Sequence, residues 1–181
     1  MRKLIMWQMI SVDGYFSGPK GELDWFVFEE DLEKYINEAH DIAGMFIYGR
    51  ATYEGMASYW PTAKGPFAEF MNAVPKVVFS RTLSSASWNN TRVVESGVAE
   101  EIRKLKQQPG KDIFLVGSAD LSATVMRHEL VDEYRFGINP VILGKGVPFF
   151  KGGGEKVNLK LTQTRPLKSG LVVLHYEPVR T

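Results

Sequence analysis

The stretch Ile113-Phe114-Leu115-Val116-Gly117-Ser118 is a continuous apolar run that ends in a glycine turn, and a segment with helical spacing, Ala119 to His128, follows it. The same unit occurs earlier, where Met45-Phe46-Ile47-Tyr48 ends in Gly49 and leads into the helical segment Arg50 to Trp60. Apolar strands that alternate with helices indicate a mostly parallel sheet that is buried on both faces. These two units therefore predict an α/β fold.

More segments of both kinds extend the pattern along the chain. Lys3 to Ser11 is rich in large and β-branched side chains, as is typical of a strand, and apolar residues then recur at helical spacing between Leu32 and Ala39. Between the two units we expect the strands Val77-Val78-Phe79 and Arg92-Val93-Val94 and the helix Val98 to Gln107.

The C-terminal third has a different pattern. Tyr134 to Asn139, Asn158 to Arg165 and Val172 to Glu177 have the composition of strands, but loops and not helices join them. We therefore expect antiparallel strands in this part of the chain. Since no linker or internal repeat divides the sequence, the prediction is one domain over residues 1–181, with a mixed, mostly parallel sheet flanked by helices.

The composition narrows the classes of function. The 22 Lys and Arg residues nearly balance the 21 Asp and Glu residues, so a net charge of +1 provides no large field to attract nucleic acid. Cysteine is absent and the three histidines lie far apart in the sequence, so we expect no metal site. No apolar stretch approaches the roughly 20 residues of a membrane helix. We expect a cytoplasmic protein without membrane or nucleic-acid partners.

Three predicted turns carry groups that suit phosphate. Gly49-Arg50-Ala51-Thr52, Ser80-Arg81-Thr82 and Gly117-Ser118-Ala119 each follow a predicted parallel strand, and the first and third open a helix. In an open α/β sheet, ligands bind outside the carboxyl ends of the strands, and a helix start favours an anion through its free N–H groups and its dipole. A dinucleotide with an additional phosphate would use all three turns, so the interpretation favours NADPH over NADH.

A set of motifs in the same order is typical of one known group of proteins. The motifs are Ser11-Val12-Asp13-Gly14-Tyr15, Gly49-Arg50-x-Thr52-Tyr53-Glu54, Val78-Phe79-Ser80-Arg81, Leu115-Val116-Gly117-Ser118-x-x-Leu121, Leu130-Val131-Asp132-Glu133-Tyr134 and Asn139-Pro140-Val141-Ile142-Leu143-Gly144-x-Gly146. From about residue 3 to residue 177, the chain resembles the reductase domain of the bacterial bifunctional riboflavin-biosynthesis deaminase-reductase, within the dihydrofolate-reductase-like superfamily.

This resemblance implies the dihydrofolate-reductase-like fold and hydride transfer from NADPH to a small heterocycle. The implied substrate is 5-amino-6-(5-phosphoribosylamino)uracil of riboflavin biosynthesis. Relatives often have a double glycine where this chain has Gly117-Ser118. The residues expected along the cofactor are Ser11, Gly49, Arg50, Thr52, Ser80, Arg81, Gly117, Ser118, Ala119 and Leu121.

The reaction also requires a proton, and a carboxyl whose pKa is raised in an apolar pocket is a usual donor or relay. Asp24 is flanked by Leu23, Trp25 and Phe26 and is the first candidate. Dihydrofolate reductases place a carboxylate in the first helix behind a Trp, and matching that Trp to Trp25 would move the role to Glu29 or Glu30. Trp25 could also stack on a flat substrate ring, and Asp13 is a further candidate for substrate binding.

Two other functions stay open at this point. One is the reduction of dihydrofolate or another pteridine, because the chain lacks the zinc-ligand set of a deaminase. The other is a non-catalytic nucleotide-binding module of the same fold, since a fold alone does not establish activity. We also expect a homodimer, because the apolar strand segment Leu171-Val172-Val173-Leu174 would require cover.

Overall fold

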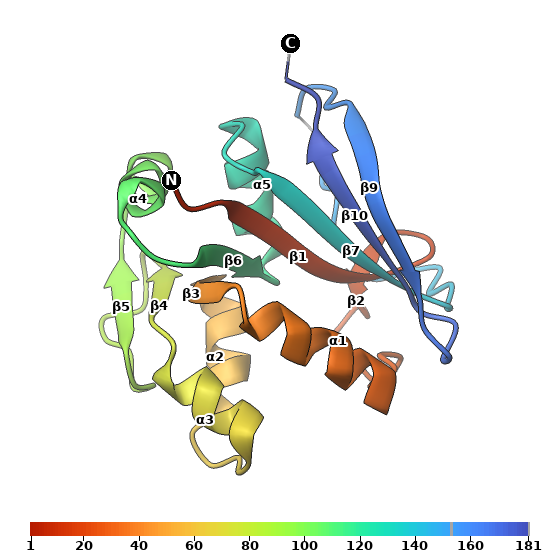
Figure 1. The fold of residues 1–181 in the computed structure, drawn as a ribbon, viewed down its shortest axis with the longest axis horizontal. Helices are drawn as coiled ribbons and strands as arrows, with labels where there is room; N and C mark the ends of the chain where they lie inside the picture. Colours follow the sequence, from red (N-terminus) through yellow and green to blue (C-terminus); the bar gives the residue numbers. More distant parts are fainter. Residues whose placement is uncertain (153, 181) are drawn as a thin grey trace.

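A twisted sheet dominates the computed structural model, which describes residues 1–152 and 154–180 (Figure 1). In this part of the chain the sheet has eight strands in the order β5-β4-β3-β6-β1-β7-β10-β9. Their bounds in that order are Thr91–Val94, Lys76–Phe79, Ala43–Gly49, Asp112–Val116, Leu4–Ser11, Glu133–Asn139, Val172–Pro178 and Leu159–Pro166. The prediction of an α/β fold with a mixed sheet is confirmed.

The strands from β5 to β7 all run parallel, whereas β10 is antiparallel to β7 and β9 is antiparallel to β10. The expectation that antiparallel strands begin at Tyr134 was therefore wrong for β7. A helix precedes β7 and carries the chain back across the sheet, so β7 pairs in parallel with β1. After β7 the structure has no further helix among the described residues, and loops join the remaining strands.

Helices cover both faces of the sheet. They are α1 (Glu30–His40), α2 (Arg50–Tyr59), α3 (Pro66–Ala73), α4 (Val98–Gln107) and α5 (Ala119–Arg127). Figure 1 shows α1, α2 and α3 on one side and α4 and α5 on the other. Strand β1 contributes Leu4 and Met6 to the core under α4 and α5, and Ile5 and Trp7 to the core under the other helices. Because alternate residues of a strand face opposite sides, burial of both faces explains the continuous apolar runs.

A small second sheet lies beside the end of β1. It pairs β2 (Tyr15–Ser17) with β8 (Val147–Pro148) in antiparallel fashion. Gly146 approaches the carbonyl oxygen of Ser17 so closely that a Cβ at this position would collide with it. The sequence patterns did not predict this sheet or α3, since two- and three-residue strands have no measurable periodicity. The small sheet joins the turn after β1 to the loop after β7.

Candidate active site

The carboxyl ends of the parallel strands bring the three predicted phosphate turns to one edge of the sheet. Gly49 at the end of β3 is in register with Phe79 at the end of β4, and Val116 at the end of β6 is in register with Trp7 of β1. Strand β6 pairs directly with both β1 and β3. The turns after β3, β4 and β6 are therefore neighbours, as their places in the sequence predicted.

Two of these turns touch each other. The backbone N–H of Gly49 donates to Ser118 Oγ over 2.7 Å, and Ser118 Oγ donates to Thr52 Oγ1 over 2.9 Å. A Cβ on Gly117 would lie 2.7 Å from both Cγ2 and Oγ1 of Thr52, so only glycine fits at this position. The N-termini of α2 and α5 thus meet at a shared corner, which we call the β3/β6 corner and define by residues 49–52 and 117–119.

The helix starts at this corner are open. Neither α2 nor α5 has a side-chain hydrogen bond that caps its N-terminus. Gly117 and Ser118 both have positive φ, 65° and 59°, and this left-handed turn leads directly into α5. Asp120 in the first turn of α5 is paired with Lys151 over 2.6 Å, which offsets its negative charge. The β3/β6 corner therefore presents backbone N–H groups that an anion could use.

The cations near this edge differ in their partners. Arg50, the first residue of α2, is exposed and pairs with Glu54 over 3.2 Å. Arg81, after β4, is exposed and forms no ion pair with the residues that the structure describes. Ser80 is buried, and its hydroxyl oxygen accepts from the N–H groups of Thr82 and Leu83, so it shapes the turn that carries Arg81. Arg81 is thus the guanidinium that is available to a phosphate.

Two expected cofactor residues have side chains in the core. Ala119 and Leu121 are each 6% exposed and belong to the cluster under α4 and α5. Any contact that they make with a ligand must therefore come from the backbone.

Ser11 and Asp13 hold the turn after β1. Ser11 is fully buried; its hydroxyl donates to Asp13 Oδ1 over 2.6 Å and accepts from the N–H of Tyr15 over 2.9 Å. Asp13 also accepts from the N–H groups of Leu143 and Gly144 over 3.1 and 2.8 Å. The hydrogen bond from Ser11 and those from the backbone lower the pKa of the Asp13 carboxyl. Asp13 is therefore an ionised anchor that ties the loop after β7 to the end of β1.

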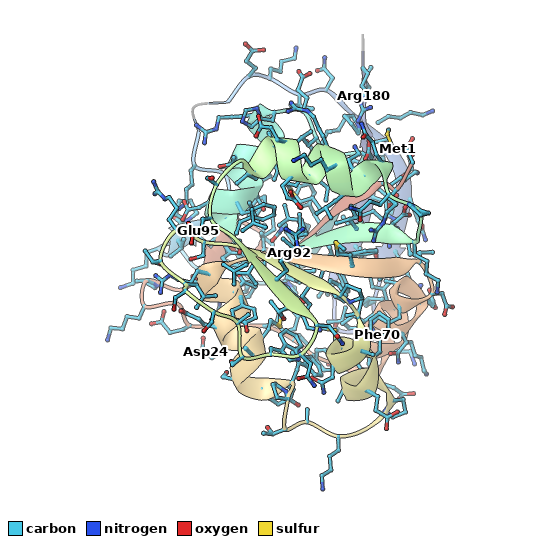
Figure 2. All side chains as sticks on the ribbon, turned by 90° about the vertical axis from the view of Figure 1, so that its left-hand side faces the viewer. Met1, Asp24, Phe70, Arg92, Glu95 and Arg180 are labelled. Carbon is cyan, nitrogen blue, oxygen red and sulfur yellow. The ribbon has the colours of Figure 1, made fainter. Side chains whose placement is uncertain are left out.

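The candidate proton donors do not lie in apolar pockets. Asp24 is exposed on the loop before α1. Figure 2 labels it at the left of the view, on the same side as Glu95. Glu30 pairs with Lys34 over 2.6 Å and its side chain is 81% exposed. The hydrogen bond from Lys34 and its positive charge lower the pKa of Glu30, which is opposite to the expected direction. That expectation was wrong because Glu30 lies on the polar side of α1, away from the buried Leu32.

Trp25 and Glu29 lie on either side of this loop's end. Trp25 is partly buried, and its indole N–H donates to the carbonyl oxygen of Glu22 over 3.2 Å. Glu29 is exposed and occupies the N-cap position of α1 without a side-chain cap bond. The structure therefore leaves Trp25 partly exposed, and it gives neither Glu29 nor Glu30 a desolvated environment.

A cavity of about 580 Å³ lies at the opposite edge of the sheet, at the amino ends of β4 and β5. Its buried Lys76 donates to the carbonyl oxygens of Met71 and Val74 over 2.8 and 2.6 Å and lies 4.3 Å from the centroid of the Trp88 ring. Because these carbonyls end α3, Lys76 closes that helix. None of the predicted site residues lines this cavity, and the three phosphate turns lie at the other end of the strands.

The chain matches a known protein family over most of its length. The model of the RibD C-terminal domain family matches residues 2–173. The chain belongs to this family. YyaP of Bacillus subtilis is 35% identical to it over 97% of this chain and 94% of that protein. This family assignment agrees with the resemblance that the motifs of the sequence indicated.

Solved structures share the fold of this RibD C-terminal domain. A deaminase/5-amino-6-(5-phosphoribosylamino)uracil reductase from Thermotoga maritima is similar with a TM-score of 0.72 and 15% identity, over 98% of this chain and 57% of that chain. A dihydrofolate reductase from Enterococcus faecalis is similar with a TM-score of 0.69 and 15% identity, over 97% of this chain and 96% of that chain. The dihydrofolate-reductase-like fold is therefore confirmed.

One residue behind the β3/β6 corner of this RibD C-terminal domain was missed by the sequence reasoning. Gln8 is 1% exposed in the middle of β1, and its amide nitrogen lies 3.1 Å from the carbonyl oxygen of Gly117 and 3.4 Å from that of Leu115. It also lies 3.3 Å from Ser122 Oγ. A polar side chain within an apolar strand was the available signal, because buried polar groups are normally hydrogen-bonded. Gln8 on β1 therefore anchors the turn between β6 and α5.

Proposed function

We propose that this member of the RibD C-terminal domain family is an NADPH-dependent reductase that transfers a hydride to a small heterocyclic substrate. The observation that carries the proposal is the meeting of two uncapped helix N-termini at the β3/β6 corner. Such helix starts bind phosphate through N–H groups and the helix dipole. The structurally similar Enterococcus faecalis enzyme is named as a complex with NADP(H), which supports the choice of cofactor.

In this proposal the cofactor diphosphate binds the backbone of residues 49–52 and 117–119. Arg81 pairs with the additional phosphate that distinguishes NADPH from NADH, since it has no carboxylate partner among the described residues. Arg50 is the weaker partner because it is shared with Glu54. Ser80, Ala119 and Leu121 act through backbone position, since their side chains are buried.

When bound, NADPH supplies the hydride, and the protein orients both rings and excludes water. Ser11 and Asp13 fix the turn after β1 and the loop after β7, which lie at the same edge as the β3/β6 corner. Trp25 offers a ring face to a flat substrate. Asp24 is the carboxyl that we retain as a proton relay from solvent, because it is exposed and Glu30 is committed to Lys34.

The substrate that we propose first is 5-amino-6-(5-phosphoribosylamino)uracil, which the name of the Thermotoga maritima protein supports. A dihydropteridine is the second candidate, because the fold of the Enterococcus faecalis dihydrofolate reductase covers 97% of this chain. Both substrates are flat heterocycles reduced by the same cofactor. A comparison of NADPH oxidation with each substrate separates them.

The experiment is a ligand screen by thermal unfolding with NADPH, NADH and FMN, followed by NADPH oxidation assays. A ligand present at a hundred times its Kd stabilises the folded state by about 2.7 kcal/mol, which raises the Tm of a domain this size by about 5–10 °C. We expect this increase with NADPH and a smaller one with NADH. Tight NADPH binding without turnover on either substrate would favour a non-catalytic module, and failure to bind any nucleotide would refute both functions.

Arg81→Ala tests the position of the additional phosphate. Loss of one charge-assisted contact, about 1.5–3 kcal/mol, should weaken NADPH binding about 10- to 100-fold and leave NADH binding unchanged. Arg127→Ala is the matched control, because Arg127 is exposed at the far end of α5. Equal losses for NADPH and NADH would contradict the assignment of Arg81.

A further inference from the structure

A second cavity lies on the face of the sheet that α1 covers, away from the β3/β6 corner. Its volume is about 390 Å³, and its walls come from α1, the amino-terminal half of β7, and strands β9 and β10. The ionisable and polar groups that line it are Tyr35, Glu38, Glu133, Arg135, Thr162, Gln163, Arg165 and His175. This volume is at the lower end of the range of small-molecule sites.

A connected set of buried polar groups forms the floor. Tyr35 Oη lies 2.8 Å from His175 Nε2, and His175 Nδ1 lies 3.4 Å from Glu133 Oε1. Arg135 donates from Nε to the same oxygen of Glu133 over 2.6 Å. Tyr35, His175 and Arg135 are each less than 10% exposed. Four polar side chains are thus desolvated together at a place that the proposed reduction does not use.

The Arg135 guanidinium is only partly satisfied. Its planar group lies over the Phe114 ring, 5.5 Å from the centroid, and Nε is the nitrogen that donates to Glu133. The guanidinium also interacts with the Tyr35 hydroxyl, and its charge and hydrogen bond limit the rise in the pKa of Tyr35 that burial causes. The Arg135 side chain is only 10% exposed, and a guanidinium so largely removed from water normally uses its remaining donors, because leaving them unpaired costs free energy. Arg135 lines the cavity, so the donors that neither Glu133 nor Tyr35 uses are available to a ligand there.

The two carboxylates beside the cavity already have partners. Glu38 receives both terminal nitrogens of Arg165, whose guanidinium carbon lies 5.3 Å from the centroid of the Tyr35 ring. Glu133 receives Arg135 Nε. The two arginines and two glutamates that line the cavity balance to zero. An entering monoanion leaves the site with one negative charge, and a dianion leaves it with two, so this balance favours the monoanion.

We propose that this cavity is a binding site for a small organic carboxylate, held by the two terminal nitrogens of Arg135. Parallel N–H groups of a guanidinium match the two oxygens of a carboxylate in one plane. Gln163 and Thr162 line the cavity from β9, and the Tyr35 hydroxyl lies beside His175 in its floor. The site is independent of the proposed reductase function, since it shares no residue with the β3/β6 corner.

The test is an NMR titration of the ¹⁵N-labelled protein with sodium propionate, with sodium chloride exchanged to keep the ionic strength constant. We expect saturable shifts confined to the amides of residues 35, 135, 163 and 175, with a Kd on the order of 1 mM for a five-atom ligand. Shifts that stay linear and spread over the surface would overturn the proposal. Inorganic phosphate is the second arm, and binding as tight as that of propionate would overturn the preference for a carboxylate.

Variants separate the guanidinium fork from charge alone. Arg135→Lys keeps the positive charge but loses the paired donors, so we expect propionate binding at least 10-fold weaker. Arg165→Gln changes a side chain at the rim that is 31% exposed, and it should weaken binding about 2- to 3-fold. It gives a second measurement if Arg135→Lys does not fold. Arg92→Gln is the control on the edge strand β5 (Figure 2), and it should leave the Kd unchanged. Unchanged binding in both Arg135→Lys and Arg165→Gln would refute the site.

Discussion

The replacement Gln8→Leu tests whether the buried amide of Gln8 holds the β3/β6 corner. The two hydrogens of this amide serve the contacts to Gly117, Leu115 and Ser122, so at most two hydrogen bonds exist at once. Their loss costs about 2 kcal/mol. Gln8 Oε1 is buried without a donor among the described residues, and removing it returns about 1 kcal/mol. Since leucine has a similar volume, the net loss of stability should be about 1 kcal/mol.

That loss corresponds to a Tm lower by about 2–4 °C for a domain of this size. The effect on NADPH should be larger than the effect on stability. Gly117 and Ser118 both have positive φ, and without the anchor their turn is free to adopt other conformations. We expect NADPH binding at least 10-fold weaker, measured by calorimetry at a temperature where the variant is folded.

Ser122→Ala is the matched control for Gln8→Leu. It removes the third partner of the Gln8 amide and the 3.4 Å contact from Ser122 Oγ to the carbonyl oxygen of Gly117, but it leaves the 3.1 Å contact from Gln8 to that oxygen in place. We expect NADPH binding within 2- to 3-fold of the original protein, in keeping with one neutral hydrogen bond of about 0.5 kcal/mol. If Gln8→Leu binds NADPH as well as the original protein does, the proposed anchor is refuted.

Three further predictions concern other parts of the molecule. Gly117→Ala should lower the free energy of unfolding in urea by more than 2 kcal/mol, because its Cβ would collide with Thr52. Gly144 also has positive φ but has open space around it, so Gly144→Ala should lower this free energy by about 1 kcal/mol. Equal losses for the two variants would contradict the close approach of Gly117 to Thr52. Burial between the Phe67 and Phe70 rings lowers the pKa of His40 to about 4. The free energy of unfolding should therefore fall by about 1–2 kcal/mol as the pH drops from 6.5 toward 4, because the folded state resists protonation of His40. A His40→Gln variant with the same pH dependence of stability would refute the assignment of this effect to His40. The segment Leu171–Leu174 was expected to require cover from a second copy, but this ground was wrong, because β10 lies between β7 and β9 and Leu171 and Val173 are buried. The homodimer that we propose would instead cover the exposed Leu159 and Leu161 on the edge strand β9, and light scattering that gives a monomer at micromolar concentration would refute it.

Periodicity in the sequence was sufficient to predict most of the sheet. Continuous apolar runs such as residues 113–116 occur where both faces of a strand are buried, and a strand flanked by helices leaves few alternatives. The common location of the three phosphate turns could then be predicted, because parallel strands place their carboxyl ends at one edge of the sheet. The sequence pattern could not show whether β7 runs parallel or antiparallel to its neighbour, because the same alternating or apolar pattern occurs in both kinds of pairing. Its pairing with β1 depends on the crossover through α5, which the sequence analysis did not connect to it.

The candidate site shows where local sequence carries too little information. Apolar neighbours at Leu23, Trp25 and Phe26 suggested a pocket for Asp24, but the burial of a loop carboxyl is decided by residues far away in the chain, and Asp24 is exposed. The cluster of Tyr35, His175 and Arg135 joins residues 40 to 140 positions apart, and no spacing rule connects them. Gln8 was visible as a polar residue within a strand, but its partner Gly117 lies 109 positions away.

The central claim is that the β3/β6 corner and Arg81 bind NADPH. A crystal structure of the protein grown with NADPH tests it most directly. We expect the diphosphate against the backbone of residues 49–52 and 117–119, with the 2′-phosphate within hydrogen-bond distance of the Arg81 guanidinium. A dinucleotide bound elsewhere on the molecule, or a 2′-phosphate that faces solvent away from Arg81, would contradict the account.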